Sequence, residues 1–142
     1  MDEIRDVIER KAALQEQGDA KAILAHYAPR YVEFNLAPPL RQAGDGEDPA
    51  ALEAWMATFE APPRHEVTQL EITTDGDVAF ATSLDRLSAV PRGGAEAFSL
   101  WYRVTLGLRR IDGQWLVTHE HESVPFEMDG SFRACTGLTP GD

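Results

Sequence analysis

The spacing of apolar residues changes near the middle of the chain from a helical pattern to alternation. Near the N-terminus, Ile4, Val7 and Ile8 recur three and four residues apart, as on one face of an amphipathic helix. We therefore expect three helices, the first of which ends at Gly18. The second is capped by Asp19 and ends before Pro29, with Ile23, Leu24 and Tyr27 as its apolar residues. The third starts at Asp48–Pro49, and its apolar residues are Leu52, Trp55, Met56 and Phe59.

The second half of the chain has the alternation of strands. After a short strand at 31–35 and a loop rich in proline and glycine, it predicts four strands: 65–73, 78–90, 96–111 and 114–124. The two longest, 78–90 and 96–111, far exceed the usual length of about 5–6 residues, so a sheet built from them has to bend strongly. Gly107 is a natural place for a bulge or bend.

These elements predict one α+β domain over residues 1–142, with a core at about 4–126 and a tail at about 127–142. We expect three N-terminal helices packed on a strongly curved antiparallel sheet, giving a cone with a cavity at its mouth. A chain of 142 residues is long enough to bury one such core.

Charge and composition narrow the range of partners. The chain has 13 basic and 24 acidic residues, and a net charge of −11 disfavours nucleic acid and anionic membranes as partners. The charged N-terminus lacks the apolar stretch of a signal peptide, and the lone Cys135 has no second cysteine to pair with. We expect a cytoplasmic protein.

Three segments carry a resemblance to a known family: "GDAKAILAHYAP", "APPLR" and "RRIDGQWLVTHEHESVPF". Together with the order of elements, they resemble the nuclear-transport-factor-2-like superfamily, and within it the SnoaL-like and ketosteroid-isomerase-homologue proteins. The last segment is also similar to the association domain of calcium/calmodulin-dependent protein kinase II. The resemblance implies the cone-shaped fold, a small-molecule ligand and a homodimer formed through the outer face of the sheet.

This fold hosts many activities, so the resemblance leaves two functions open. One is a cofactor-independent isomerase, cyclase or hydratase that uses acid–base chemistry on a small, apolar, oxygenated substrate. The other is a non-catalytic ligand-binding or oligomerisation module. Asn35 stands where ketosteroid isomerases have their catalytic aspartate, and Gly107 falls near their second acid, which argues against the same isomerisation. Asn35 either donates a hydrogen bond to a ligand carbonyl or ties down the loop that follows.

Alternation along strand 114–124 separates its histidines from its glutamates. It groups His119 and His121 with Trp115 and Val117 on one face, and Glu120 and Glu122 on the other with Leu116 and Thr118. The resemblance implies that Glu122 and Arg86 point into the cavity. Our catalytic candidates are therefore Glu122, Glu120 and Arg86, with His119 and His121 in their place if the strand faces the other way.

Arg103 meets either Glu122 or His121 across the last hairpin, depending on the length of its turn. With Asn35, Trp55 and Trp101, Arg103 completes the ligand-binding candidates. A histidine pair needs a third metal ligand, and no spacing singles one out among Glu33, His26, His65 and Asp85, so we expect no metal. For the dimer, we expect an outer row along strand 96–111: Leu100, Tyr102, Val104, Leu106 and Leu108.

Overall fold

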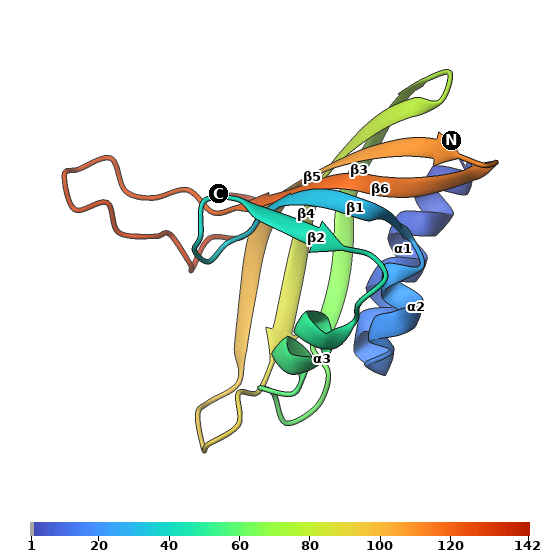
Figure 1. Cartoon of the computed structure of the whole chain (residues 1–142). Helices are drawn as coiled ribbons and strands as arrows, with labels where there is room; N and C mark the ends of the chain where they lie inside the picture. Colours follow the sequence, from blue (N-terminus) through green and yellow to red (C-terminus); the bar gives the residue numbers. More distant parts are fainter. Residues whose placement is uncertain (1) are drawn as a thin grey trace.

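The computed structural model describes residues 2–142, which form three helices and one six-stranded sheet (Figure 1). The helices are α1 (Asp2–Gln17), α2 (Ala20–Leu24) and α3 (Ala50–Met56). The strands are β1 (Tyr27–Phe34), β2 (Gln42–Asp45), β3 (Arg64–Asp75), β4 (Val78–Ala89), β5 (Phe98–Ile111) and β6 (Gln114–Ser123).

The sheet is mixed, with the strand order β2-β1-β6-β5-β4-β3. β1 runs parallel to β6, and every other neighbouring pair is antiparallel, so the prediction of an antiparallel sheet is wrong at this one junction. The predicted curvature is also too strong: the sheet is not strongly curled, and residues 2–142 enclose no cavity at the mouth of a cone. The α+β class is confirmed.

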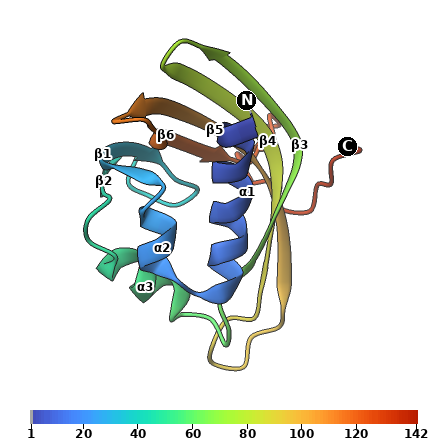
Figure 2. The same ribbon diagram turned by 90° about the vertical axis from the view of Figure 1, so that its right-hand side faces the viewer.

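One face of the sheet, here called the inner face, is covered by α1, and α2 lies beside α1 (Figure 2). Ile4 and Ile8 of α1 are buried there against Leu108 and Val117 of the sheet. Side chains of a helix stripe and of alternate strand positions leave water together, and this burial is the main stabilisation of the fold. The opposite face of the sheet is called the outer face.

The junction between the first two helices agrees with the sequence. Gly18 has a φ of +73°, the left-handed backbone conformation that glycine adopts easily at a helix C-terminus. Asp19 caps α2, because its carboxylate accepts a hydrogen bond of 3.1 Å from the Ala22 amide. α2 nevertheless stops at Leu24, and Tyr27 already begins β1, four residues before the predicted start of the strand.

Two further boundaries differ from the prediction. The segment expected to be only a loop contains β2, which pairs with β1 from Arg30↔Asp45 to Glu33↔Gln42. The third helix is shorter than its apolar spacing indicates, because Phe59 pairs with Pro91 in an isolated bridge outside α3. The four long strands lie where alternation places them, within two residues at each end.

A bulge in β6 overturns the predicted division of its side chains. Leu108 pairs with Val117 and Gly107 with His119, so Thr118 is the extra residue. The bulge changes the phase of the strand, and Val117 therefore lies on the same face as Glu120 and Glu122 rather than with the histidines. The two-residue turn Asp112–Gly113 is confirmed, but the bulge pairs Arg103 with Ser123, so both predicted partners of Arg103 are wrong.

The apolar row of β5 that we expected on the outer face, at a dimer interface, lies on the inner face. Tyr102, Val104, Leu106 and Leu108 are buried within this single chain. The argument from that row for a homodimer is therefore wrong, although the dimer itself stays a prediction.

The chain continues past β6 into an arm, residues 124–142, that projects beyond the sheet (Figure 1). Backbone hydrogen bonds close its turn, from Glu127 N to Arg133 O (2.8 Å) and from Cys135 N to Pro125 O (2.8 Å). Throughout the described part of the chain, we find no helix with the length and apolar character needed to cross a membrane.

Candidate functional site

Polar side chains cross the inner face of the sheet from β1 to β3 beneath α1. Antiparallel pairing places Glu120 beside Leu106 and Glu122 beside Val104, and parallel pairing places Glu33 beside Glu120. Asp85 pairs with Tyr102. We call this set the inner belt; it consists of Glu33, His65, Asp85, Tyr102, Glu120 and Glu122.

Glu120 is the best-anchored member of the inner belt. Lys11 Nζ of α1 lies 3.2 Å from Glu120 Oε1, and the Tyr27 hydroxyl donates to the same oxygen at 2.8 Å. Burial lowers the pKa of Lys11, but the charge and hydrogen bond of Glu120 outweigh it and raise that pKa overall. Burial and the neighbouring Glu120 charge raise the pKa of Tyr27 well above its ordinary value. Lys11 is therefore charged and Tyr27 keeps its proton.

Glu122 lies next to this ion pair and takes no part in it. Within residues 2–142 its carboxyl has no hydrogen bond or ion pair of its own, and its oxygens keep some contact with solvent. Burial, followed by the charge of Glu120, raises the pKa of Glu122 to about 8. At neutral pH, Glu122 is therefore a protonated acid beside the Glu120 side chain that Lys11 contacts, an arrangement suited to proton transfer.

Asn35 and Glu33 lie at the end of β1, where the inner belt reaches the surface. The Asn35 amide nitrogen donates to Glu33 Oε2 at 2.9 Å and also to Gln42 Oε1. Both N–H groups of Asn35 are engaged within the chain, and the bond to Gln42 spans the loop that follows, which agrees with the second predicted role of Asn35. Donation to a ligand carbonyl stays a prediction. Burial and the charge of Glu120 raise the pKa of Glu33, although its hydrogen bond with Asn35 opposes the shift.

The other end of the inner belt is a buried histidine–aspartate pair. His65 Nε2 lies 2.6 Å from Asp85 Oδ2, and the Ser83 hydroxyl donates to Asp85 Oδ1 at 2.7 Å. The second ring nitrogen of His65 lies 3.2 Å from Gln15 Oε1 of α1. The Tyr102 hydroxyl is 3.4 Å from His65 Nε2, and burial raises the pKa of Tyr102 far above its ordinary value. Every polar atom of the imidazole is thus engaged.

His119 and His121 lie on the outer face, away from the inner belt. The Phe34 ring packs edge-on against both, at centroid distances of 4.9 and 5.3 Å. His119 Nδ1 lies 2.8 Å from the Val32 carbonyl oxygen, to which it donates a hydrogen bond. The structure therefore places the two glutamates on the inner face, as we predicted. Across residues 2–142, no group of three His, Cys, Asp or Glu side chains has the geometry of a metal site, and the absence of a metal stays a prediction.

The arginine candidates and Trp101 also lie on the outer face. The residues on either side of Arg86 in β4, Asp85 and Leu87, are buried on the inner face, so Arg86 points outward. The prediction that Arg86 faces a cavity is therefore wrong. Arg86 instead stacks on Trp101, with its guanidinium carbon 5.7 Å from the ring centroid.

The two remaining ligand candidates are also outside the inner belt. Arg103 Nε donates to Ser123 Oγ at 3.1 Å on the outer face, so Arg103 does not meet Glu122. Trp55 is exposed on α3 and packs edge-on against Phe59. Of the proposed ligand contacts, only Asn35 lies beside the glutamates of the inner belt.

Three important members of the site were missed by sequence reasoning: Lys11, Tyr27 and Tyr102. Lys11 had a signal that could have been used, because it continues the buried stripe of Ile4 and Ile8 at helical spacing. A lysine in that position needs an anionic partner on the surface that covers it. His65 and Asp85 were considered only as metal ligands, since their distance in sequence hides their contact.

The fold and its polar inner face define the class: this is an α+β protein of the nuclear-transport-factor-2-like kind. The chain belongs to the SnoaL-like domain family, whose sequence pattern matches residues 4–127. No curated protein is similar to it in sequence.

Three solved structures illustrate the range of relatives. A nuclear-transport-factor-2-like protein of unknown function from Pseudomonas putida is 36% identical, with 98% of this chain and 95% of that chain covered and a TM-score of 0.83. A protein named "Putative Scytalone Dehydratase" from Novosphingobium aromaticivorans is 15% identical, with coverages of 98% and 94% and a TM-score of 0.78. A "Putative calcium/calmodulin dependent protein kinase II association domain" from Xanthomonas campestris is 18% identical, with coverages of 85% and 84% and a TM-score of 0.71. The last two show the fold alone.

Proposed function

We propose that this protein binds a small oxygenated molecule at the open end of the inner belt and acts on it as an acid–base lyase or isomerase. The observation that carries the proposal is Glu122, a carboxyl with a pKa of about 8 that has no partner of its own among residues 2–142. A buried acid that is protonated at neutral pH and free to bond a ligand is rarely useful to stability alone.

In the proposed reaction, Glu122 and Glu33 of the inner belt take the two opposite roles of acid and base. Glu122, protonated at neutral pH, donates a proton to the departing or rearranging oxygen of the substrate. Glu33, in its carboxylate form, accepts a proton from the substrate carbon, and Asn35 accepts a hydrogen bond from a substrate hydroxyl through its free carbonyl oxygen. Lys11 fixes the charge of Glu120, which in turn keeps the pKa of Glu122 high.

Burial along β1 supports a ligand position at this end. Tyr27 and Tyr31 are buried, whereas Glu33 and Asn35 are only half-buried. The inner belt is therefore closed at Lys11 and open towards Asn35, beside the loop between β1 and β2. Elimination of water is the favoured reaction because it needs one acid and one base, and a dehydratase name occurs among the structures of this fold.

A substrate screen tests the proposal directly. The protein is incubated with a panel of small β-hydroxy ketones and β-hydroxy acids, and mass spectrometry follows the loss of water from each. We expect turnover of at least one class, lost in Glu122→Gln and retained in Glu71→Gln, a control on an exposed glutamate of β3. Equal turnover by both variants would show that Glu122 is not needed for the reaction. No turnover across the panel would contradict the proposal that the protein is an enzyme of this kind.

A non-catalytic module is the second candidate, favoured by the pairing of Glu120 with Lys11 and by apolar residues exposed on the outer face. Val78 and Phe80 are about half exposed there. For this candidate we propose a homodimer formed through the outer face. Sedimentation at micromolar concentration should show a dimer that Phe80→Glu converts to monomer, and a wild-type monomer would contradict the proposed association.

A further inference from the structure

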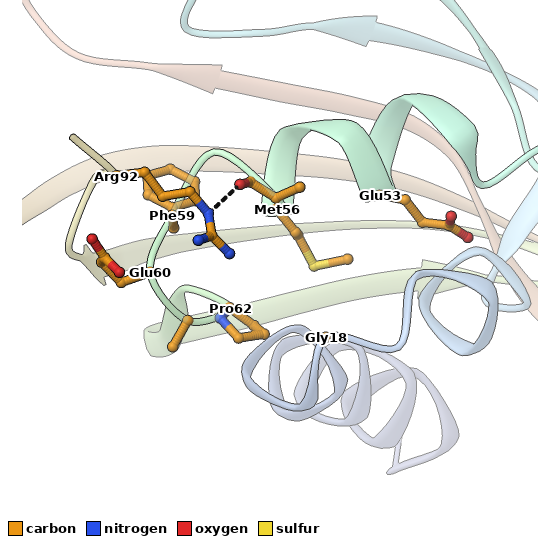
Figure 3. A pocket seen from close by; sticks show the side chains of 9 residues that line it. Gly18, Glu53, Met56, Phe59, Glu60, Pro62 and Arg92 are labelled. Carbon is orange, nitrogen blue, oxygen red and sulfur yellow. Dashed lines mark hydrogen bonds between the residues drawn. The ribbon is translucent and has the colours of Figure 1, made fainter.

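A surface pocket of about 260 Å³ lies apart from the inner belt, between the end of α1, α3 with its following loop, and the β4–β5 loop (Figure 3). Its apolar floor is formed by Met56 and Phe59, which are both buried, and by Pro62. Gly18 closes one side, and a side chain there would collide with Pro62, since its Cβ would stand 2.7 Å from Pro62 Cγ. Three segments that are separate in sequence therefore pack closely around the floor of the pocket.

Arg92 is held over this floor by two hydrogen bonds. Its backbone amide donates to Thr58 O at 2.9 Å, and its Nε donates to Ala57 O at 2.8 Å. Figure 3 shows the rest of the guanidinium extending over the pocket towards Pro62. Among the described residues, no carboxylate lies within ion-pair distance of Arg92 and no acceptor bonds its terminal nitrogens. Arg92 is therefore an oriented, exposed cation with both terminal NH2 groups still available.

An oriented guanidinium matches a carboxylate, which takes two parallel hydrogen bonds from it. The apolar floor beneath it matches a hydrocarbon or aromatic body, and a pocket of about 260 Å³ is of the size that takes a small molecule. Glu53 and Glu60 stand on the rim (Figure 3), where their negative charges disfavour a second anionic group on the ligand.

We propose that this pocket binds a small monocarboxylate with an apolar body of about benzoate size, held at its carboxylate by Arg92. The site is separate from the inner belt, so the proposal is independent of the proposed acid–base function. Its ligand selectivity follows from three parts: the guanidinium selects an anion, the floor selects an apolar body, and the rim excludes a dianion.

Amide chemical shifts in a two-dimensional NMR titration test the site with benzoate as the probe. We expect saturable shifts centred on Gly18, Met56 and Phe59, with binding about tenfold weaker for benzyl alcohol and weaker again for phthalate. Arg92→Gln should weaken benzoate binding about tenfold. The matched control is Arg41→Gln, which removes an exposed arginine elsewhere on the surface and should bind benzoate as the wild type does.

Two more variants keep the test decisive. Arg92→Lys keeps the positive charge but loses the planar guanidinium that donates two parallel hydrogen bonds to a carboxylate. This variant should therefore bind benzoate more weakly than the wild type does. Ala61→Trp fills the pocket from its rim and should abolish binding while Arg92 stays in place. Thermal unfolding verifies that each variant is folded. Equal binding of benzyl alcohol and benzoate, unchanged binding in Arg92→Gln or Ala61→Trp, or no saturable shifts up to about 20 mM benzoate would overturn the proposal.

Discussion

Replacing Glu122 by glutamine should stabilise the protein at alkaline pH and change little at acidic pH. Folding raises the pKa of this carboxyl from 4.5 to about 8, mainly because burial disfavours its charge. Between these two pH values the folded state holds a proton that the unfolded state has released. The free energy of unfolding of the wild type therefore falls as pH rises through this window. Glutamine is neutral at every pH and does not contribute this loss.

The size of the effect follows from the same pKa. Ionising Glu122 in the folded state costs at most roughly 5 kcal/mol above pH 8, at about 1.4 kcal/mol for each pH unit of the window. The carboxyl oxygens keep some contact with water, which screens the charge, so we expect a net gain of about 2–3 kcal/mol for Glu122→Gln. Below about pH 5 the wild type and the variant should unfold alike.

Urea denaturation followed by tryptophan fluorescence measures this difference at about pH 5 and about pH 8.5. Glu71→Gln, on the exposed side of β3, is the matched control and should show no pH-dependent gain. A Glu122→Gln variant that is equally affected at both pH values, or less stable than the wild type at alkaline pH, would refute the reasoning from burial.

Three further substitutions should change the free energy of unfolding at neutral pH, measured by urea denaturation in each case. Lys11→Met leaves Glu120 buried without its cation and should cost about 3–5 kcal/mol, most of which Glu120→Gln in the same chain should recover; an additive double variant would contradict the pair. Asp85→Asn weakens the charged acceptor of His65 and should cost about 1.5–3 kcal/mol, whereas no loss would show that this pair adds nothing. Arg86→Ala, on the outer face, should cost less than about 1 kcal/mol, and a larger loss would place Arg86 in a structural role.

The order and type of the long elements could be predicted because each has a strong local signal. Gly18 and Asp19 mark the junction of the first two helices by backbone and side-chain chemistry that acts within a few residues. The turn at Asp112–Gly113 is equally local, and the structure keeps it as a two-residue turn. Such features do not depend on what packs against them.

The faces of the strands were harder to predict because they depend on distant contacts. One extra residue at Thr118 reverses the phase of β6. Gly107, where we predicted a bulge or bend, lies opposite this irregularity, but nothing near Thr118 shows that the extra residue belongs to β6. On β4, the family resemblance implied that Arg86 points inward, and the structure places Arg86 on the outer face. Ala79 and Ala81 are buried on the inner face instead, and Phe80 is about half exposed.

The candidate site could be predicted only where it lies within one strand. Glu120 and Glu122 were selected correctly as inward-facing residues, but their partner Lys11 is 109 residues from Glu120 in sequence. Parallel pairing of β1 with β6, which sequence reasoning did not predict, brings Glu33 beside Glu120. The chemistry of the site therefore depends on a topology that only the folded chain provides.

The protonation of Glu122 at neutral pH is the central claim, and carbon-13 NMR of side-chain carboxyls measures it most directly. The resonance absent from Glu122→Gln identifies this carboxyl in the wild-type spectrum. We predict that it titrates near pH 8, with a lower pKa in Glu120→Gln, because the neighbouring charge is then removed. A Glu122 resonance that titrates near 4.5 in the wild type would show an ordinary ionised carboxylate and contradict the account.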